Sequence, residues 1–180
     1  MNTLLFATDA YKRKRSKKIA EKLLRENLVK GVVLNIGCGK GYLEHELKKF
    51  NPSVDLFGID IDEPKDYPGT FLRGDFEEIR ISTKFDVIIM SLSLHHLRQP
   101  KKALSKVYEI LAPDGVLFIL EIAPKKTLWK KLLFDTGILC LKKVHTWTES
   151  ELKKLIQETK FSITKEERFP IQAIILYAKK

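Results

Sequence analysis

The sequence contains only two cysteines, Cys38 and Cys140, among its 180 residues. They lie far apart and form no spacing typical of a metal site, so we expect two free thiols and no bound metal. No apolar run comes near the roughly 18 residues that a membrane span requires. The few apolar residues at the N-terminus precede the first cations, whereas a secretory signal has the opposite order, and we therefore expect a cytoplasmic protein.

The chain is too short for two ordinary domains but long enough for one domain with a substantial core. Hydrophobic residues make up 44% of it and charged residues 31%, which is typical of globular proteins. No repeat, low-complexity segment or linker interrupts the sequence. We expect a single domain over residues 1–180, with a basic helical cap over residues 1–30 and a candidate lid over residues 124–147.

Positive charge is in excess, with a formal net charge of +10. Six of the seven residues from Lys12 to Lys18 are cations, and a second cluster consists of Lys125, Lys126, Lys130, Lys131, Lys142 and Lys143. Such runs fit two interpretations, a solvated helix face or a surface for an anionic partner. Nucleic acid is one such partner, although we favour a small molecule for reasons given below.

Strand-like and helix-like segments alternate along most of the chain. Strand patterns cover residues 32–36, 54–60, 71–73, 85–91 and 116–122, and helical patterns cover residues 12–28 and 42–50 and begin again at Pro100 and after Thr148. This alternation predicts a doubly wound α/β fold. Two further strand patterns, 161–169 and 171–178, are separated only at Pro170. Since parallel neighbours need a long crossover, one of them must be reversed in an otherwise mostly parallel sheet.

The segment Gly37-Cys38-Gly39-Lys40-Gly41 lies between the first strand pattern and the next helical one. Glycines at this point allow a sharp turn and a close approach of backbone to ligand, which is typical of a nucleotide pocket. The dinucleotide fingerprint does not fit, because Tyr42 stands where its third glycine is needed. A phosphate-binding P-loop does not fit either, because no Gly-Lys-Ser/Thr follows at the required offset.

With its other motifs, this segment resembles the class I S-adenosylmethionine-dependent methyltransferases of the small-molecule, type 11-like branch. The resemblance is carried by residues 33–41, 58–60, 74–76, 85–91, 94–97, 111–117 and the terminal part from Thr148 to Ala178. It implies a Rossmann-like sheet of seven strands in the order 3-2-1-4-5-7-6, with one antiparallel strand near the C-terminus. It also implies S-adenosyl-L-methionine as cofactor and S-adenosyl-L-homocysteine as product.

The resemblance assigns roles to individual residues. The loop should face the methionine part of the cofactor, Asp60 should accept both ribose hydroxyls with Ile61 beside it, and Asp75 and Phe76 should hold the adenine. Ser91 should lie near the methionine end. The cofactor-binding residues are thus Asn35, Gly37, Cys38, Gly39, Gly41, Asp60, Ile61, Asp75, Phe76 and Ser91.

Two features depart from that family. Asn35 stands where an acid usually orients the amino end of the cofactor. Only fourteen residues separate Asp60 from Asp75, so the helix expected between them must be short or absent. Asp62 or Glu63 could then replace Asp60 at the ribose.

Methyl transfer from a sulfonium requires mainly alignment of the acceptor, and removal of its proton adds to the rate. The candidate catalytic bases are His95, His96 and Glu121, with His145 as a further candidate. The paired histidines do not indicate a metal, because no third ligand has a suitable spacing. The N-terminal helix and residues 124–147 are the natural covers of the pocket, and the apolar and cationic residues of the latter suit an apolar or anionic acceptor.

These observations predict methyl transfer to a small-molecule acceptor. Two alternatives are an RNA- or protein-modifying methyltransferase that uses the basic N-terminus, and a cofactor-binding protein without activity.

Overall fold

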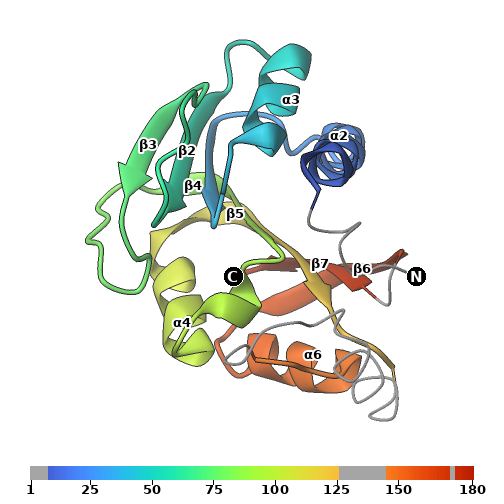
Figure 1. Ribbon diagram of the computed structural model, residues 1–180. Helices are drawn as coiled ribbons and strands as arrows, with labels where there is room; N and C mark the ends of the chain where they lie inside the picture. Colours follow the sequence, from blue (N-terminus) through green and yellow to red (C-terminus); the bar gives the residue numbers. More distant parts are fainter. Residues whose placement is uncertain (1–7, 126–144, 171–172) are drawn as a thin grey trace.

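The computed structural model describes residues 8–125, 145–170 and 173–180. Its helices are α2 (Asp9–Arg25), α3 (Tyr42–Phe50), α4 (Pro100–Ile110) and α6 (Glu149–Gln157), with a short 3-10 turn, η1, at Leu94–His96. Its strands are β1 (Val32–Ile36), β2 (Asp55–Asp60), β3 (Thr70–Arg73), β4 (Phe85–Ser91), β5 (Leu111–Ile122), β6 (Ser162–Phe169) and β7 (Ala173–Lys179). The alternation expected from the sequence is therefore present (Figure 1).

The seven strands form one sheet in the order β3-β2-β1-β4-β5-β7-β6, which is the expected order. Strands β1 to β5 pair in parallel, whereas β7 runs antiparallel to both of its neighbours, β5 and β6. The prediction of a single reversed strand near the C-terminus is confirmed. Strands β6 and β7 follow each other too closely for a crossover, so only antiparallel pairing is open to them.

Each face of the sheet has its own hydrophobic core, because successive side chains of a strand point to opposite faces. Val33 of β1 packs with Ile19 and Leu23 of α2 and with Leu43 and Leu47 of α3. The next residue, Leu34, belongs to the core on the other face, together with Leu104 and Val107 of α4 and Leu152 and Ile156 of α6. Figure 1 shows these two helix pairs on opposite faces of the sheet.

The first described helix ends earlier than its sequence pattern predicts, at Arg25 rather than at residue 28. Asn27 adopts a left-handed conformation with φ 55°. The N–H groups of Asn27 and Leu28 then donate to the carbonyls of Leu24 and Leu23, at 3.0 and 2.8 Å. These two bonds form a Schellman motif, which closes the helix and returns Leu28 to the core.

Two other boundaries bear on the site. Strand β5 begins at Leu111 rather than at residue 116, with a register shift against β4 between Phe85 and Val87. The expected start of the last helix is confirmed, because Thr148 and Glu151 form a reciprocal capping box. Between Asp60 and Thr70 the structure has no helix, as the short spacing predicted.

None of the described helices is both long enough and apolar enough to cross a membrane. Cys38 is a free, buried thiol. Cys140 and most of the candidate lid, residues 126–144, lie outside the described residues.

Candidate functional site

An open cavity of about 1550 Å³ lies at the carboxyl ends of the parallel strands. Its lining includes nine of the ten residues predicted to bind a cofactor, namely Asn35, Gly37, Cys38, Gly39, Asp60, Ile61, Asp75, Phe76 and Ser91. Gly41 is the exception. Of the candidate bases, His96 lines the cavity, whereas His95, Glu121 and His145 do not. A cavity at this edge of a doubly wound sheet is the usual place for a ligand.

The glycine segment after β1 depends on backbone angles that other residues rarely adopt. Gly37, Gly39 and Gly41 have φ values of 75°, 56° and 71°. The N–H groups of Gly37 and Cys38 both donate to the carbonyl of Ile59 at the end of β2, which ties the segment to the neighbouring strand. A Cβ at Gly37 would lie 2.5 Å from the Cβ of Ser93, so the segment after β4 also requires glycine here.

Asp60 fixes the tip of this glycine segment. One of its carboxylate oxygens accepts the N–H of Gly39 at 2.7 Å, and the other accepts the N–H of Asp62 at 3.2 Å. Each oxygen has a second lone pair, which can accept a further donor such as a hydroxyl group. Ile61 beside it is 65% exposed. Asp62 and Glu63 also line the cavity, and Glu63 lies 3.9 Å from Arg73.

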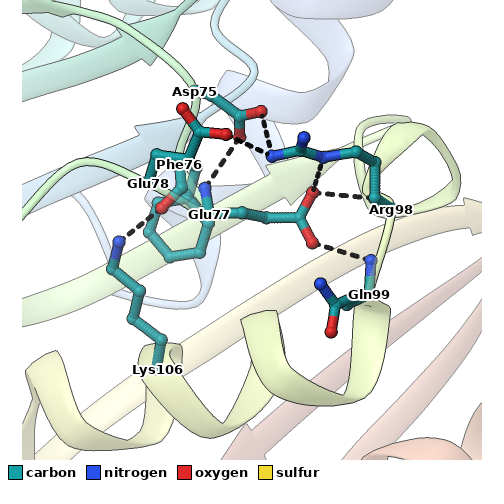
Figure 2. Close-up of polar contacts among 7 residues, drawn as sticks. All are labelled: Asp75, Phe76, Glu77, Glu78, Arg98, Gln99 and Lys106. Carbon is teal, nitrogen blue, oxygen red and sulfur yellow. Dashed lines mark hydrogen bonds and ion pairs between the residues drawn. The ribbon is translucent and has the colours of Figure 1, made fainter.

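Arg98 connects three acidic residues beside the cavity (Figure 2). Its guanidinium contacts the carboxylates of Asp75 at 2.9 Å, Glu78 at 2.8 Å and Glu77 at 3.4 Å. Burial alone would raise the pKa of Glu77, but the N–H groups of Arg98 and Gln99 and the guanidinium lower it. Asp75 therefore faces the cavity with its orientation fixed by an ion pair and by the N–H of Glu77. Nothing in the local sequence pattern distinguishes Arg98 from other exposed cations.

Asn35, at the floor of the cavity, is paired with an acid that the sequence analysis did not identify. Its Nδ2 donates to Oε1 of Glu44 at 2.6 Å, and both side chains are buried. Burial raises the pKa of Glu44 to about 7. The Oδ1 of Asn35 is buried and makes no hydrogen bond, whereas the hydroxyl of Tyr67 lies close to Glu44 and Cys38. The available signal was the position of Glu44, one turn before Leu47 on the apolar face of α3.

The remaining candidate bases form a buried pair behind the cavity wall. His95 Nδ1 lies 2.7 Å from Oε1 of Glu121, whose other oxygen accepts the backbone N–H of His95 at 3.3 Å. Glu121 is 1% exposed. The carbonyl of His95 accepts the N–H of His145 at 2.9 Å, so His145 helps to hold the same segment. Partial burial, followed by the influence of His95, lowers the pKa of His96, the imidazole that reaches the cavity.

Helix α2 contributes several residues to the lining of the cavity. Lys12, Arg13, Arg15, Ser16 and Ile19 line the cavity. The helix is fastened to the glycine segment and α3 by two contacts, an ion pair of 2.8 Å between Lys40 and Asp9 and the guanidinium of Arg13 at 4.2 Å from the centre of the Tyr42 ring. Among the described residues no cluster of three or more metal-ligating side chains occurs.

Known proteins share sequence and fold with this chain. A family model described as a methyltransferase domain matches residues 11–166. Malonyl-acyl-carrier-protein O-methyltransferase of Calditerrivibrio nitroreducens is 35% identical over 109 residues, which cover 56% of this chain and 44% of that protein. The mitochondrial arginine-hydroxylase NDUFAF5 of Rattus norvegicus is 33% identical over 93 residues, covering 47% of this chain and 27% of that protein. The chain thus spans less than half the length of either relative.

A solved structure shows the same fold. Magnesium protoporphyrin IX methyltransferase from Synechocystis PCC 6803, with bound SAH, has a TM-score of 0.67 and 20% sequence identity, covering 93% of this chain and 83% of that one.

Proposed function

The chain belongs to the methyltransferase domain family, and from that premise we propose that it transfers a methyl group from S-adenosyl-L-methionine to a small-molecule acceptor. The observation that carries the proposal is the glycine segment held against the carboxylate of Asp60 at the edge of the cavity. The backbone of this segment can approach a ligand closely, and the carboxylate beside it suits a ligand with hydroxyl groups.

The residues present fit this cofactor. A Cβ at Gly39 would meet no atom within 4 Å, so the absence of a side chain leaves open space beside the cavity. Asp60 would accept the ribose hydroxyls next to the exposed Ile61, and Asp75 with the backbone of Phe76 would hold the adenine. The unpartnered Oδ1 of Asn35 is an acceptor suited to the amino group of the methionine part.

The bound cofactor would supply a methyl carbon that its sulfonium has already activated for displacement. The chain's own contribution is then chiefly alignment, which supplies on the order of 7–11 kcal/mol in favourable cases. Residues of helix α2 and of the segment after β4 line the cavity, and both would limit the movement of an acceptor and the access of water. The buried His95–Glu121 pair holds the segment that carries His96.

His96 is the residue we assign as proton acceptor for acceptors that must lose a proton. Its lowered pKa leaves the ring neutral at pH 7, and a neutral imidazole accepts a proton at its free nitrogen. His95 and Glu121 are positioning residues under this proposal, because neither lines the cavity.

The test is incubation with methyl-labelled S-adenosyl-L-methionine and an extract of the source cells, followed by separation of the labelled products by size. The proposal predicts label in the small-molecule fraction. Label in RNA or protein would instead support a macromolecular substrate. Binding of an RNA substrate should weaken steeply as the salt concentration is raised. Cofactor binding without label transfer would favour a non-catalytic protein. Because one relative is named an arginine hydroxylase, oxygen incorporation is measured in the same fractions.

A further inference from the structure

Arg15 is a cation of the cavity wall with a buried donor that is unsatisfied in the described part of the chain. Arg15 projects from the middle of α2 and lines the cavity. Its Nε is buried and makes no hydrogen bond, and among the described residues its guanidinium forms no ion pair. Three other cations of the helix and its surroundings do have partners: Lys40 pairs with Asp9, Arg13 stacks on Tyr42, and Lys22 pairs with Glu167. A buried donor without a partner is destabilising, so its retention suggests a use.

The surroundings of Arg15 place it on the β5 side of the cavity. Burial lowers the pKa of Arg15, and the nearby Tyr11 and Glu121 oppose that effect. Arginine nevertheless stays charged in proteins. Glu121 also binds the backbone N–H of His95, so Arg15 lies on the same side as the segment after β4.

A second unpartnered polar group lines the same cavity. The hydroxyl of Ser93 is buried in a side chain that is 6% exposed, and it makes no hydrogen bond. The apolar residues Ile19, Leu92 and Leu97 line the same cavity. The cavity therefore offers a fixed cation, a hydroxyl and apolar surface in addition to the carboxylates of Asp60 and Asp75.

We propose that Arg15 binds a carboxylate of the methyl acceptor, so that the acceptor is an organic acid with an apolar body. The inference rests on the proposed function, because it concerns the second ligand of the same cavity. A guanidinium presents parallel N–H donors that match a carboxylate, and such charge-assisted pairs are stronger than neutral ones. The nearby carboxylate of Glu121 favours a singly charged anion over a doubly charged phosphate.

The test compares sodium octanoate with octanamide, its neutral counterpart, by calorimetric titration of the full chain saturated with S-adenosyl-L-homocysteine. We expect octanoate to bind at least tenfold more tightly than octanamide. Arg15→Met should abolish this preference, and Arg15→Lys should retain only part of it. Lys18→Met removes the same charge from an exposed position of α2 that does not line the cavity, and should leave the preference unchanged.

Two results would overturn the inference: equal affinity of the wild type for acid and amide, or an undiminished preference in Arg15→Met. Tighter binding of octyl phosphate than of octanoate would equally overturn the assignment to a carboxylate. Titration with S-adenosyl-L-homocysteine alone separates this inference from the proposed function, because failure of that binding in the wild type counts against the function itself. Arg15→Lys keeps the comparison decisive should Arg15→Met not fold.

Discussion

Asn35 donates a hydrogen bond of 2.6 Å from Nδ2 to Oε1 of Glu44, and both side chains are buried beneath the glycine segment. The resemblance to class I methyltransferases places an acid at position 35, on the strand. Here the carboxyl group stands on α3 instead, and the amide takes its place at the cavity floor. One carboxyl group, that of Glu44, is therefore still present in this region, but it does not line the cavity. Asn35 lines the cavity and presents an uncharged oxygen.

This arrangement makes the stability of the protein depend on pH. Burial raises the pKa of Glu44 from 4.5 to about 7, so the folded state holds the proton more tightly than the unfolded state. The stabilising contribution is complete below pH 4.5 and is lost as the pH rises through 7, by about 3 kcal/mol in total. Glu44→Gln should remove this pH-dependent loss of stability. The free energy of unfolding of Glu44→Gln, measured in urea, should therefore rise relative to that of the wild type by about 3 kcal/mol between pH 4.5 and pH 8.5.

Glu109→Gln provides the matched control, since Glu109 is exposed on α4. It should show the pH dependence of the wild type. Parallel stability curves for Glu44→Gln and the wild type over this range would refute the assignment.

Asn35→Asp should be strongly destabilising at neutral pH. It would place a second carboxyl group against Glu44 in a buried site, where two like charges cannot both be accommodated. We expect a loss of about 2 kcal/mol or more at pH 8 and a smaller loss at pH 5, measured by urea unfolding. Adding Glu44→Gln to Asn35→Asp should recover most of the stability, because the amide can then donate to the carboxylate. A double variant no more stable than Asn35→Asp would contradict this account.

Asp60→Ala should weaken binding of S-adenosyl-L-methionine by about tenfold or more, because a hydrogen bond to a charged group contributes roughly 1.5–3 kcal/mol. Calorimetric titration measures this directly. Asp60→Asn separates two roles, since the amide oxygen can still accept the N–H of Gly39 while the charge is lost. Asp62→Ala is the control from the same cavity wall, and a larger loss there would transfer the ribose role to Asp62.

Arg98→Gln should weaken cofactor binding about three- to tenfold but leave the stability against urea nearly unchanged, because the Arg98 side chain is 60% exposed. The reason is orientation: the guanidinium holds Asp75 at the end of the cavity where the adenine is proposed to bind (Figure 2). Lys101→Gln, which breaks the exposed pair with Glu158, should leave binding unchanged. Tighter binding in Arg98→Gln would mean that Arg98 competes with the ligand for Asp75.

The sequence was sufficient to predict the sheet, because hydrophobic periodicity and the short connection at Pro170 act locally. The same holds for the glycine segment, whose residues are consecutive, and for the missing helix after Asp60, which follows from spacing. The cytoplasmic location stays a prediction. Glu44, Arg98 and Arg15 were not identified, because what distinguishes each is a relation to another segment. The end of α2 at Arg25 was not predicted either. This helix is closed by Asn27 in a left-handed conformation, and such a residue, when it is not glycine, leaves no clear signal in the sequence.

Glu121→Ala should destabilise the protein on the order of 3 kcal/mol. Removal of this fully buried carboxylate would leave His95 Nδ1 and the backbone N–H groups of His95 and Ile122 without an acceptor. Glu121→Gln keeps the shape and one acceptor oxygen, so thermal unfolding should rank it between the wild type and Glu121→Ala.

Since Glu121 does not line the cavity, Glu121→Gln should bind S-adenosyl-L-homocysteine within about twofold of the wild type. It should transfer label more slowly, because His96 would be misplaced. Loss of cofactor binding in Glu121→Gln would argue against a positioning role, and unchanged label transfer would show that the His95–Glu121 pair serves the fold alone.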